Sequence, residues 1–121
     1  MSFKNLLAYQ KGFELAMEIF EISKSFPKEE TYSLTDQIRR SSRSTCANIA
    51  EAYRKSNYPK HFVIKHTDSD SEYSKTQVWI DFSEACNYIS IEKKETLINK
   101  SKEVGKLINY MIINPKKFGV N

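Results

Sequence analysis

Glycine and proline are scarce in this chain, and long apolar runs are missing from it. The 121 residues hold three glycines and three prolines, which argues against a loop-rich, collagen-like or disordered chain. Three scattered glycines cannot form a glycine-rich phosphate loop. No run approaches the roughly 20 apolar residues that span a bilayer, and the start lacks the apolar segment of a secretion signal. We therefore expect one cytoplasmic domain, residues 1–121, built mainly from helices.

Residue types that carry chemistry are also few and badly spaced. The two cysteines, Cys46 and Cys86, lack metal-ligand spacing and are expected to be buried thiols. His61 and His66 are five residues apart, which does not place them on one helical face as a metal pair requires, and both are expected to be exposed or to face a partner. The sequence thus predicts no catalytic residue, no metal site and no cofactor, and the protein is not expected to be an enzyme.

Acidic side chains repeat along the first helical segment. Glu14, Glu18 and Glu21 lie on one face, but the Glu-x-x-His partner motif of a di-metal helical bundle is absent. A solvated acidic face is the simpler interpretation.

Three loop signals divide the chain into four helical segments. Apolar residues recur at helical spacing over residues 6–25, 34–55, 60–88 and from 91 to about 113. Pro27, Pro59 and Pro115 follow or begin these segments, Ser90 is a candidate N-cap, and Ser33 with Asp36 forms a potential capping box. Short loops between long amphipathic helices predict an all-α, antiparallel up-and-down four-helix bundle with a flexible C-terminal tail from about residue 114.

The expected core follows from the same spacing. Phe13, Phe20, Phe62 and Phe82 fall at core positions of their segments. The first half of the third segment, residues 65–72, is polar nearly all round, which leaves room for a bulge or a kink.

The excess positive charge is concentrated in the second segment. The formal net charge is +4. Residues 38–55 hold one acid, Glu51, and five cations: Arg39, Arg40, Arg43, Arg54 and Lys55. The rest of the chain is neutral. On a helical projection Arg39, Arg40, Arg43 and Arg54 fall within about 100° of one another, interleaved with Ala47 and Ala50, on the face opposite a seam of small residues.

This basic stripe supports two hypotheses. In the first, the arginines contact nucleic-acid phosphates, for which a planar fork of donors on a low, alanine-lined face is well suited. In the second, they pair with acids of neighbouring helices or subunits in a protein-interaction scaffold. We expect the first, an oligomeric nucleic-acid-associated module whose contacts are made by the four arginines and Lys55, and keep the scaffold as the alternative.

Polar residues beside the stripe carry a similar ambiguity. Asn48 and Glu51 are neighbours at i and i+3 on one edge of the helix, and Gln37 lies nearer its start. They form either a polar network, within the chain or at an oligomer interface, or the lining of a ligand site.

The densest combination of motifs runs from residue 26 to residue 51. It consists of Phe26-Pro27-Lys28-Glu29-Glu30, then Gln37-Ile38-Arg39-Arg40-Ser41, then Asn48-Ile49-Ala50-Glu51. Together with Thr76-Gln77-Val78-Trp79, this pattern resembles the four-helix-bundle proteins encoded in intervening sequences of bacterial 23S rRNA genes. The chain departs from that pattern at Ala52, where the family usually has glycine, and at Lys75, where an acid is common.

The resemblance implies a small all-α protein without established activity that assembles as a homo-oligomeric ring, typically a pentamer. A related group, the accessory proteins of diversity-generating retroelements, contacts a reverse transcriptase and nucleic acid. The resemblance therefore implies RNA, DNA or a reverse transcriptase as candidate partners.

Overall fold

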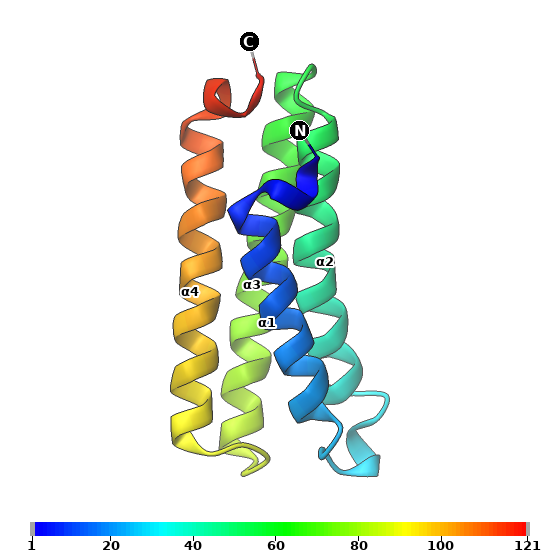
Figure 1. Ribbon diagram of the computed structural model, residues 1–121. Coiled ribbons are helices and arrows are strands. Elements are labelled where there is room, and N and C mark those ends of the chain that lie inside the picture. The colour runs from blue at the N-terminus through cyan, green and yellow to red at the C-terminus, as the bar shows by residue number, and fades with distance from the viewer. Residues whose placement is uncertain (1, 121) are drawn as a thin grey trace.

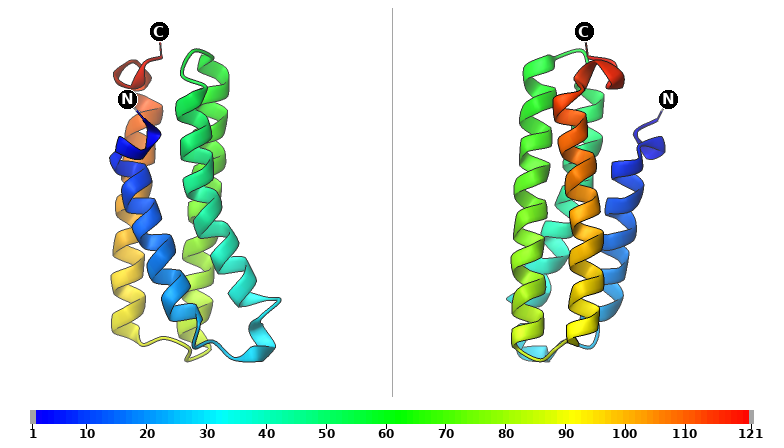
Figure 2. Two further views of the ribbon diagram at one scale, coloured as in Figure 1. Left: turned by 45° about the vertical axis from the view of Figure 1, so that its right-hand side comes forward. Right: turned by 90° about the vertical axis from the view of Figure 1, so that its left-hand side faces the viewer.

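The computed structural model describes residues 2–120 as four long helices that pack side by side (Figure 1). The helices are α1 (Leu7–Ser23), α2 (Leu34–Arg54), α3 (Pro59–Ala85) and α4 (Ile91–Ile113). Short 3-10 turns flank them at Phe3–Asn5, Lys28–Glu30 and Pro115–Phe118. Successive helices run in opposite directions, so α1 begins and α4 ends at the same end of the bundle (Figure 2). The predicted all-α four-helix bundle is confirmed.

Local signals fix most helix ends. Pro59 occupies the first turn of α3, where its missing N–H costs nothing. Ser90 caps α4, because its Oγ accepts a hydrogen bond from the Lys93 backbone N–H at 3.0 Å.

The capping box predicted at the start of α2 is wrong. The Ser33 hydroxyl instead donates to Glu30 Oε1 at 2.5 Å, and the same oxygen accepts from the Leu34 backbone N–H at 3.4 Å. The turn at Lys28–Glu30 brings this carboxylate over the end of the helix, so Glu30 serves the α2 N-terminus in place of the serine.

The segment after α4, expected to be a flexible tail, folds back as a short turn. Gly119 adopts a left-handed backbone with φ of 88°, which glycine accepts without strain. The Val120 N–H donates to the Pro115 carbonyl at 3.2 Å, and the Val120 side chain is buried. Burial of this one valine anchors the segment to the end of the bundle.

The polar first half of α3 continues without a break into the second half. One small hydroxyl residue of the first half and one of the second half face α2. Ser69 Oγ donates to the Thr45 carbonyl at 2.8 Å, and Thr76 Oγ1 donates to Ser41 Oγ at 2.9 Å. These buried bonds satisfy polar groups between α2 and α3. The bulge or kink that the polar sequence of residues 65–72 allowed does not interrupt α3.

The hydrophobic core contains one of the predicted phenylalanines in full. Phe62 is completely buried and Phe20 is half-buried. Phe13 and Phe82 were expected in the core, but about half of each side chain is exposed. In α1 the buried row contains Leu15 and Ile19, and a residue two positions before Leu15 points to nearly the opposite side of the helix.

Two further expectations are wrong. Cys46 is buried, but Cys86, just beyond the end of α3, is exposed. His66 was expected at the surface, yet it is fully buried with its ring edge-on to Phe62 at 4.6 Å between centroids. Neither ring nitrogen has a hydrogen-bond partner within residues 2–120. Burial lowers the pKa of His66 to about 4, so the imidazole is neutral at pH 7.

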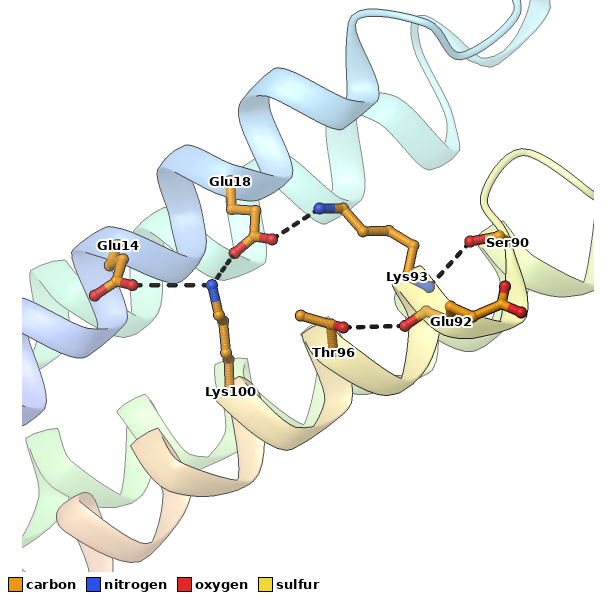
Figure 3. Close-up of polar contacts among 7 residues, drawn as sticks. All are labelled: Glu14, Glu18, Ser90, Glu92, Lys93, Thr96 and Lys100. Atoms are coloured by element: carbon orange, nitrogen blue, oxygen red, sulfur yellow. Dashed lines mark hydrogen bonds and ion pairs between the residues drawn. The ribbon is translucent and has the colours of Figure 1, made fainter.

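Ion pairs close the side of the bundle formed by α1 and α4 (Figure 3). The Glu18 carboxylate binds Lys100 Nζ at 2.6 Å and Lys93 Nζ at 2.9 Å. Glu14 lies 3.8 Å from the same Lys100 nitrogen. The expected solvated acidic face is therefore wrong for Glu18, which only tertiary packing brings to the lysines of α4.

Candidate functional site

The outer side of α1 and α2 forms an apolar groove. Its volume is about 390 Å³. Nine residues line this α1/α2 groove: Phe3, Tyr9, Phe13, Ala16, Met17, Arg43, Cys46, Ala47 and Ala50. Phe13 and Met17 project from α1 with about half of each side chain exposed. The short alanines of α2 keep the floor low, because a larger residue at their positions would fill the groove.

Three arginines of the predicted stripe lie over aromatic rings beside this groove. The guanidinium carbons of Arg39 and Arg43 stand 4.8 and 5.6 Å from the centre of the Phe20 ring. Arg54 lies 5.6 Å from the centre of Phe3. Arg39 Nε also donates to Ser23 Oγ at 2.7 Å. Stacking over rings positions these side chains while leaving part of each guanidinium free to donate.

The other two cations of residues 38–55, Arg40 and Lys55, lie elsewhere. Arg40 is directed along α2 to Asp36, with Nε 3.3 Å from Oδ2, and borders a polar hollow toward α3 that also contains Lys75. Lys55 follows the end of α2, with its ammonium 5.9 Å from the ring centre of Tyr58. Arg43 thus lines the α1/α2 groove, Arg54 lies over Phe3 of its lining, and Arg39 shares the Phe20 ring with Arg43. Arg40 and Lys55 do not line it.

Among the residues that the structure describes, no carboxylate side chain lines the groove. Among the ion pairs of residues 2–120, none involves Arg39, Arg43, Arg54 or Lys55. By contrast, the cations of α4 that face α1 are paired, as Lys93 and Lys100 are with Glu18. The α1/α2 side therefore presents uncompensated positive charge beside an apolar surface.

The three polar residues of the predicted network are not grouped together. Glu51 reaches α3 and lies 3.0 Å from Lys65 Nζ. This pair helps to raise the pKa of Lys65, first through its hydrogen bond to Glu51. Gln37 lies 14 residues before Glu51 on the same helix, which is about 21 Å along the axis. Asn48 is half-buried between them. Glu51 thus acts as one link between α2 and α3.

Sequence reasoning missed the apolar part of this site. It assigned Phe13 to the core and did not identify an exposed apolar surface on α1. The overlooked signal is on α2, where Ala47 and Ala50 interrupt the basic face. Small side chains on an outer face leave a hollow beside the larger side chains of the adjacent helix.

Covalent and metal chemistry have little support at this groove. Burial raises the pKa of the Cys46 thiol to about 11, so its nucleophilic thiolate is scarce at pH 7. Within residues 2–120 no group of three or more His, Cys, Asp or Glu side chains is placed to hold a metal ion. In the same part of the chain, no helix has the length and apolar character needed to cross a membrane.

Comparisons with known proteins agree with this fold. No curated protein matches the chain. A crystal structure of a protein of unknown function from the S23 ribosomal protein family of Bacteroides thetaiotaomicron is similar, with a TM-score of 0.79 and 29% sequence identity. The match covers 88% of this chain and 95% of the other. The family model described as 23S rRNA-intervening sequence protein matches residues 4–110, so the chain belongs to that family.

Proposed function

We propose that this protein is a non-enzymatic module that self-associates, and that the α1/α2 groove is the surface through which it does so. The observation that carries the proposal is the groove itself, where aromatic rings, Met17 and Arg43 line one exposed hollow. Aromatic residues, methionine and arginine are the types enriched in protein interfaces, whereas lysine and glutamate are depleted.

Energetics support the same conclusion. Leaving large apolar side chains half-exposed forgoes stabilisation of about 25 cal/mol for each Å² that a partner would bury. Phe13 and Met17 each keep about half of their surface in water in the single chain. A second protein surface would recover this area, and it would also give the unpaired arginines acceptors.

The test is the molar mass of the protein in solution. Wild-type protein should show a multiple of 14.1 kDa by size-exclusion chromatography with light scattering, with a concentration-dependent share of single chains. Met17→Glu places a charge in the groove and should give single chains. Ile113→Glu is the matched control, because it adds the same charge at an exposed apolar residue of α4. Single chains of wild type at all concentrations, or an assembly unaffected by Met17→Glu, contradict the proposal.

Nucleic-acid binding is the second candidate. The specific observation in its favour is that Arg39, Arg43, Arg54 and Lys55 form no ion pair with a carboxylate of residues 2–120. The span from Arg39 to Arg54 is about 22 Å along α2, a length over which cations can contact several phosphates. Binding of this kind has little sequence preference and weakens steeply with salt. A short structured RNA that shifts the protein at low salt and is released at moderate salt supports this candidate, and indifference to RNA at both removes it.

A further inference from the structure

One end of the bundle is strongly basic. The start of α1, the connection between α2 and α3 and the segment after α4 all lie at this end (Figure 1). Residues 2–13, 52–67 and 104–120 contain no acidic residue. Six exposed cations at this end form no ion pair with a carboxylate of residues 2–120, and we name them the basic end: Lys4, Arg54, Lys55, Lys60, Lys116 and Lys117.

The opposite end of the bundle is acidic. It is formed by residues 20–36 and 78–95, where α1 and α3 end and α2 and α4 begin (Figure 2). These residues include eight acids and four cations. The net charge therefore changes sign along the axis of the bundle. Near a negatively charged surface, such a molecule is steered so that its basic end approaches first and its acidic end points away.

Exposed apolar side chains lie among the cations of the basic end. Tyr58 precedes the first turn of α3, Tyr110 lies in the last turn of α4, and Ile113 ends α4. All three are exposed, Ile113 by 66%. Lys55 Nζ lies 5.9 Å from the ring centre of Tyr58, and Lys117 Nζ lies 5.2 Å from that of Tyr110. Cations beside exposed tyrosine and aliphatic side chains are typical of protein surfaces that enter the headgroup region of a bilayer.

The distribution of the cations favours a flat partner over a linear one. They come from the turn before α1, the end of α2, the start of α3 and the turn after α4. They are therefore spread over the whole end of the bundle, whereas the phosphates of a nucleic acid follow a line along each strand. A phosphate backbone also offers no apolar region to Ile113, and the boundary between lipid headgroups and acyl chains does.

We propose that the basic end is a docking surface for an anionic lipid bilayer, on which the bundle stands end-on. The ammonium groups and the Arg54 guanidinium donate hydrogen bonds to lipid phosphates and carboxylates, while Tyr58, Tyr110 and Ile113 enter the headgroup region. Each cation near an anionic membrane raises the affinity about fivefold, so six together support a stable contact. This surface is separate from the α1/α2 groove, because neither Lys60 nor Lys116 lines that groove.

Flotation of the protein with lipid vesicles tests this proposal. Wild type should float with vesicles of phosphatidylcholine and phosphatidylserine, stay behind with phosphatidylcholine alone, and be released by salt. The double variant Lys60→Glu/Lys116→Glu should lower the partition coefficient at least about tenfold. Lys28→Glu/Lys102→Glu is the matched control, because it changes the net charge equally at exposed lysines outside the basic end. This control should bind within about twofold of wild type.

Ile113→Ser tests the apolar part of the contact at unchanged net charge. It should weaken binding to the anionic vesicles about threefold, because less apolar surface leaves water. Far-ultraviolet circular dichroism checks folding of each variant, and Lys60→Gln/Lys116→Gln repeats the charge test if the glutamate variant does not fold.

Three results would overturn the inference. The first is wild type that does not float with the anionic vesicles, and the second is equal binding by the two double lysine variants. The third is binding of a short structured RNA through Lys60 and Lys116 without vesicle binding, which assigns the basic end to nucleic acid. The light-scattering mass of Lys60→Glu/Lys116→Glu should equal that of wild type, so each of these failures leaves the proposed self-association standing.

Discussion

Helix α1 has two very different sides. Toward α4, Glu18 is joined to Lys93 and Lys100 within the chain. Toward α2, the outer surface is an apolar groove whose arginines lie on aromatic rings and reach no carboxylate in residues 2–120. The charged side chains of the first side are paired within a single chain, whereas the arginines of the second side have no carboxylate partner among residues 2–120. Under the proposed function, the α4 side serves stability and the α2 side serves recognition.

This division can be examined by mutation. Changes on the closed α1/α4 side and in the interior should alter the free energy of unfolding and leave association unaffected. Changes on the open α1/α2 side should do the reverse. A variant on either side that changes the free energy of unfolding and the strength of self-association equally would contradict this division.

The largest change in the free energy of unfolding is expected from His66, a titratable side chain inside the apolar core. His66 is buried without a hydrogen-bond partner, and its pKa falls to about 4, whereas in the unfolded chain it titrates near 6.5. The unfolded state therefore binds a proton that the folded state excludes. The stability present above pH 6.5 should fall with pH, by about 2 kcal/mol between pH 6.5 and 5.

Urea unfolding at a series of pH values measures this loss. His66→Leu, of similar size, should remove most of the dependence between pH 6.5 and 5, and it should stabilise the protein at pH 5. His61→Leu is the control, because His61 is exposed. Equal pH slopes for wild type and His66→Leu would contradict the assignment.

A smaller effect is expected on the open side. Replacement of Arg39, Arg40 and Arg43 by Glu should weaken self-association about tenfold, or about 1.4 kcal/mol, because Arg43 lines the groove and Arg39 lies over the same Phe20 ring, so negative charge would replace positive charge beside the apolar surface. The same variant should lose any binding to RNA. Its unfolding midpoint in urea should stay near that of wild type, since the arginines form no carboxylate pair other than Arg40 with Asp36 among the described residues. Unchanged light-scattering mass and unchanged RNA binding in a folded variant would remove the arginines from both candidate functions.

The smallest effect is expected on the closed side. Burial raises the pKa of Glu18, but hydrogen bonds from Lys100 and Lys93 outweigh it and the pKa is lowered overall. The ionised carboxylate therefore contributes stability above its ordinary pKa of 4.5, and this contribution is lost as the pH falls through the lowered value. Glu18→Gln should cost about 1 kcal/mol at pH 7 and progressively less below pH 4.5.

Thermal unfolding of Glu18→Gln beside Glu21→Gln provides the comparison. Glu21 forms an exposed pair with Lys24 on α1, so its replacement should change the midpoint little. Association should be the same in both variants. A dissociated Glu18→Gln protein would show that the α1/α4 side also takes part in assembly.

Local patterns made much of the fold predictable. The number of helices, their order and Pro59 and Ser90 at helix starts follow from apolar spacing, proline positions and a capping serine, all of which act within a few residues. The cluster of arginines on α2 was likewise visible, because five cations against one acid is a property of the chain and not of its packing.

The candidate site was only partly predictable. The arginines were named, but the aromatic rings beneath them come from α1 and the Phe3–Asn5 turn. Nothing in the spacing of α2 indicates which rings another helix will bring near. The groove therefore became visible only with the helices packed together.

By itself, the sequence determined the helices and where the positive charge lies, because hydrophobic periodicity, caps and prolines act locally. Tertiary structure alone decided which apolar row of α1 entered the core, why Phe13 and Phe82 stayed outside, and how His66 came to be buried. It also decided that Glu18 pairs with two lysines, whereas Arg39, Arg43 and Arg54 pair with no carboxylate in the part of the chain that the structure describes. The physical reason is that burial and ion pairing depend on distances between helices, and those distances are set when all four pack together.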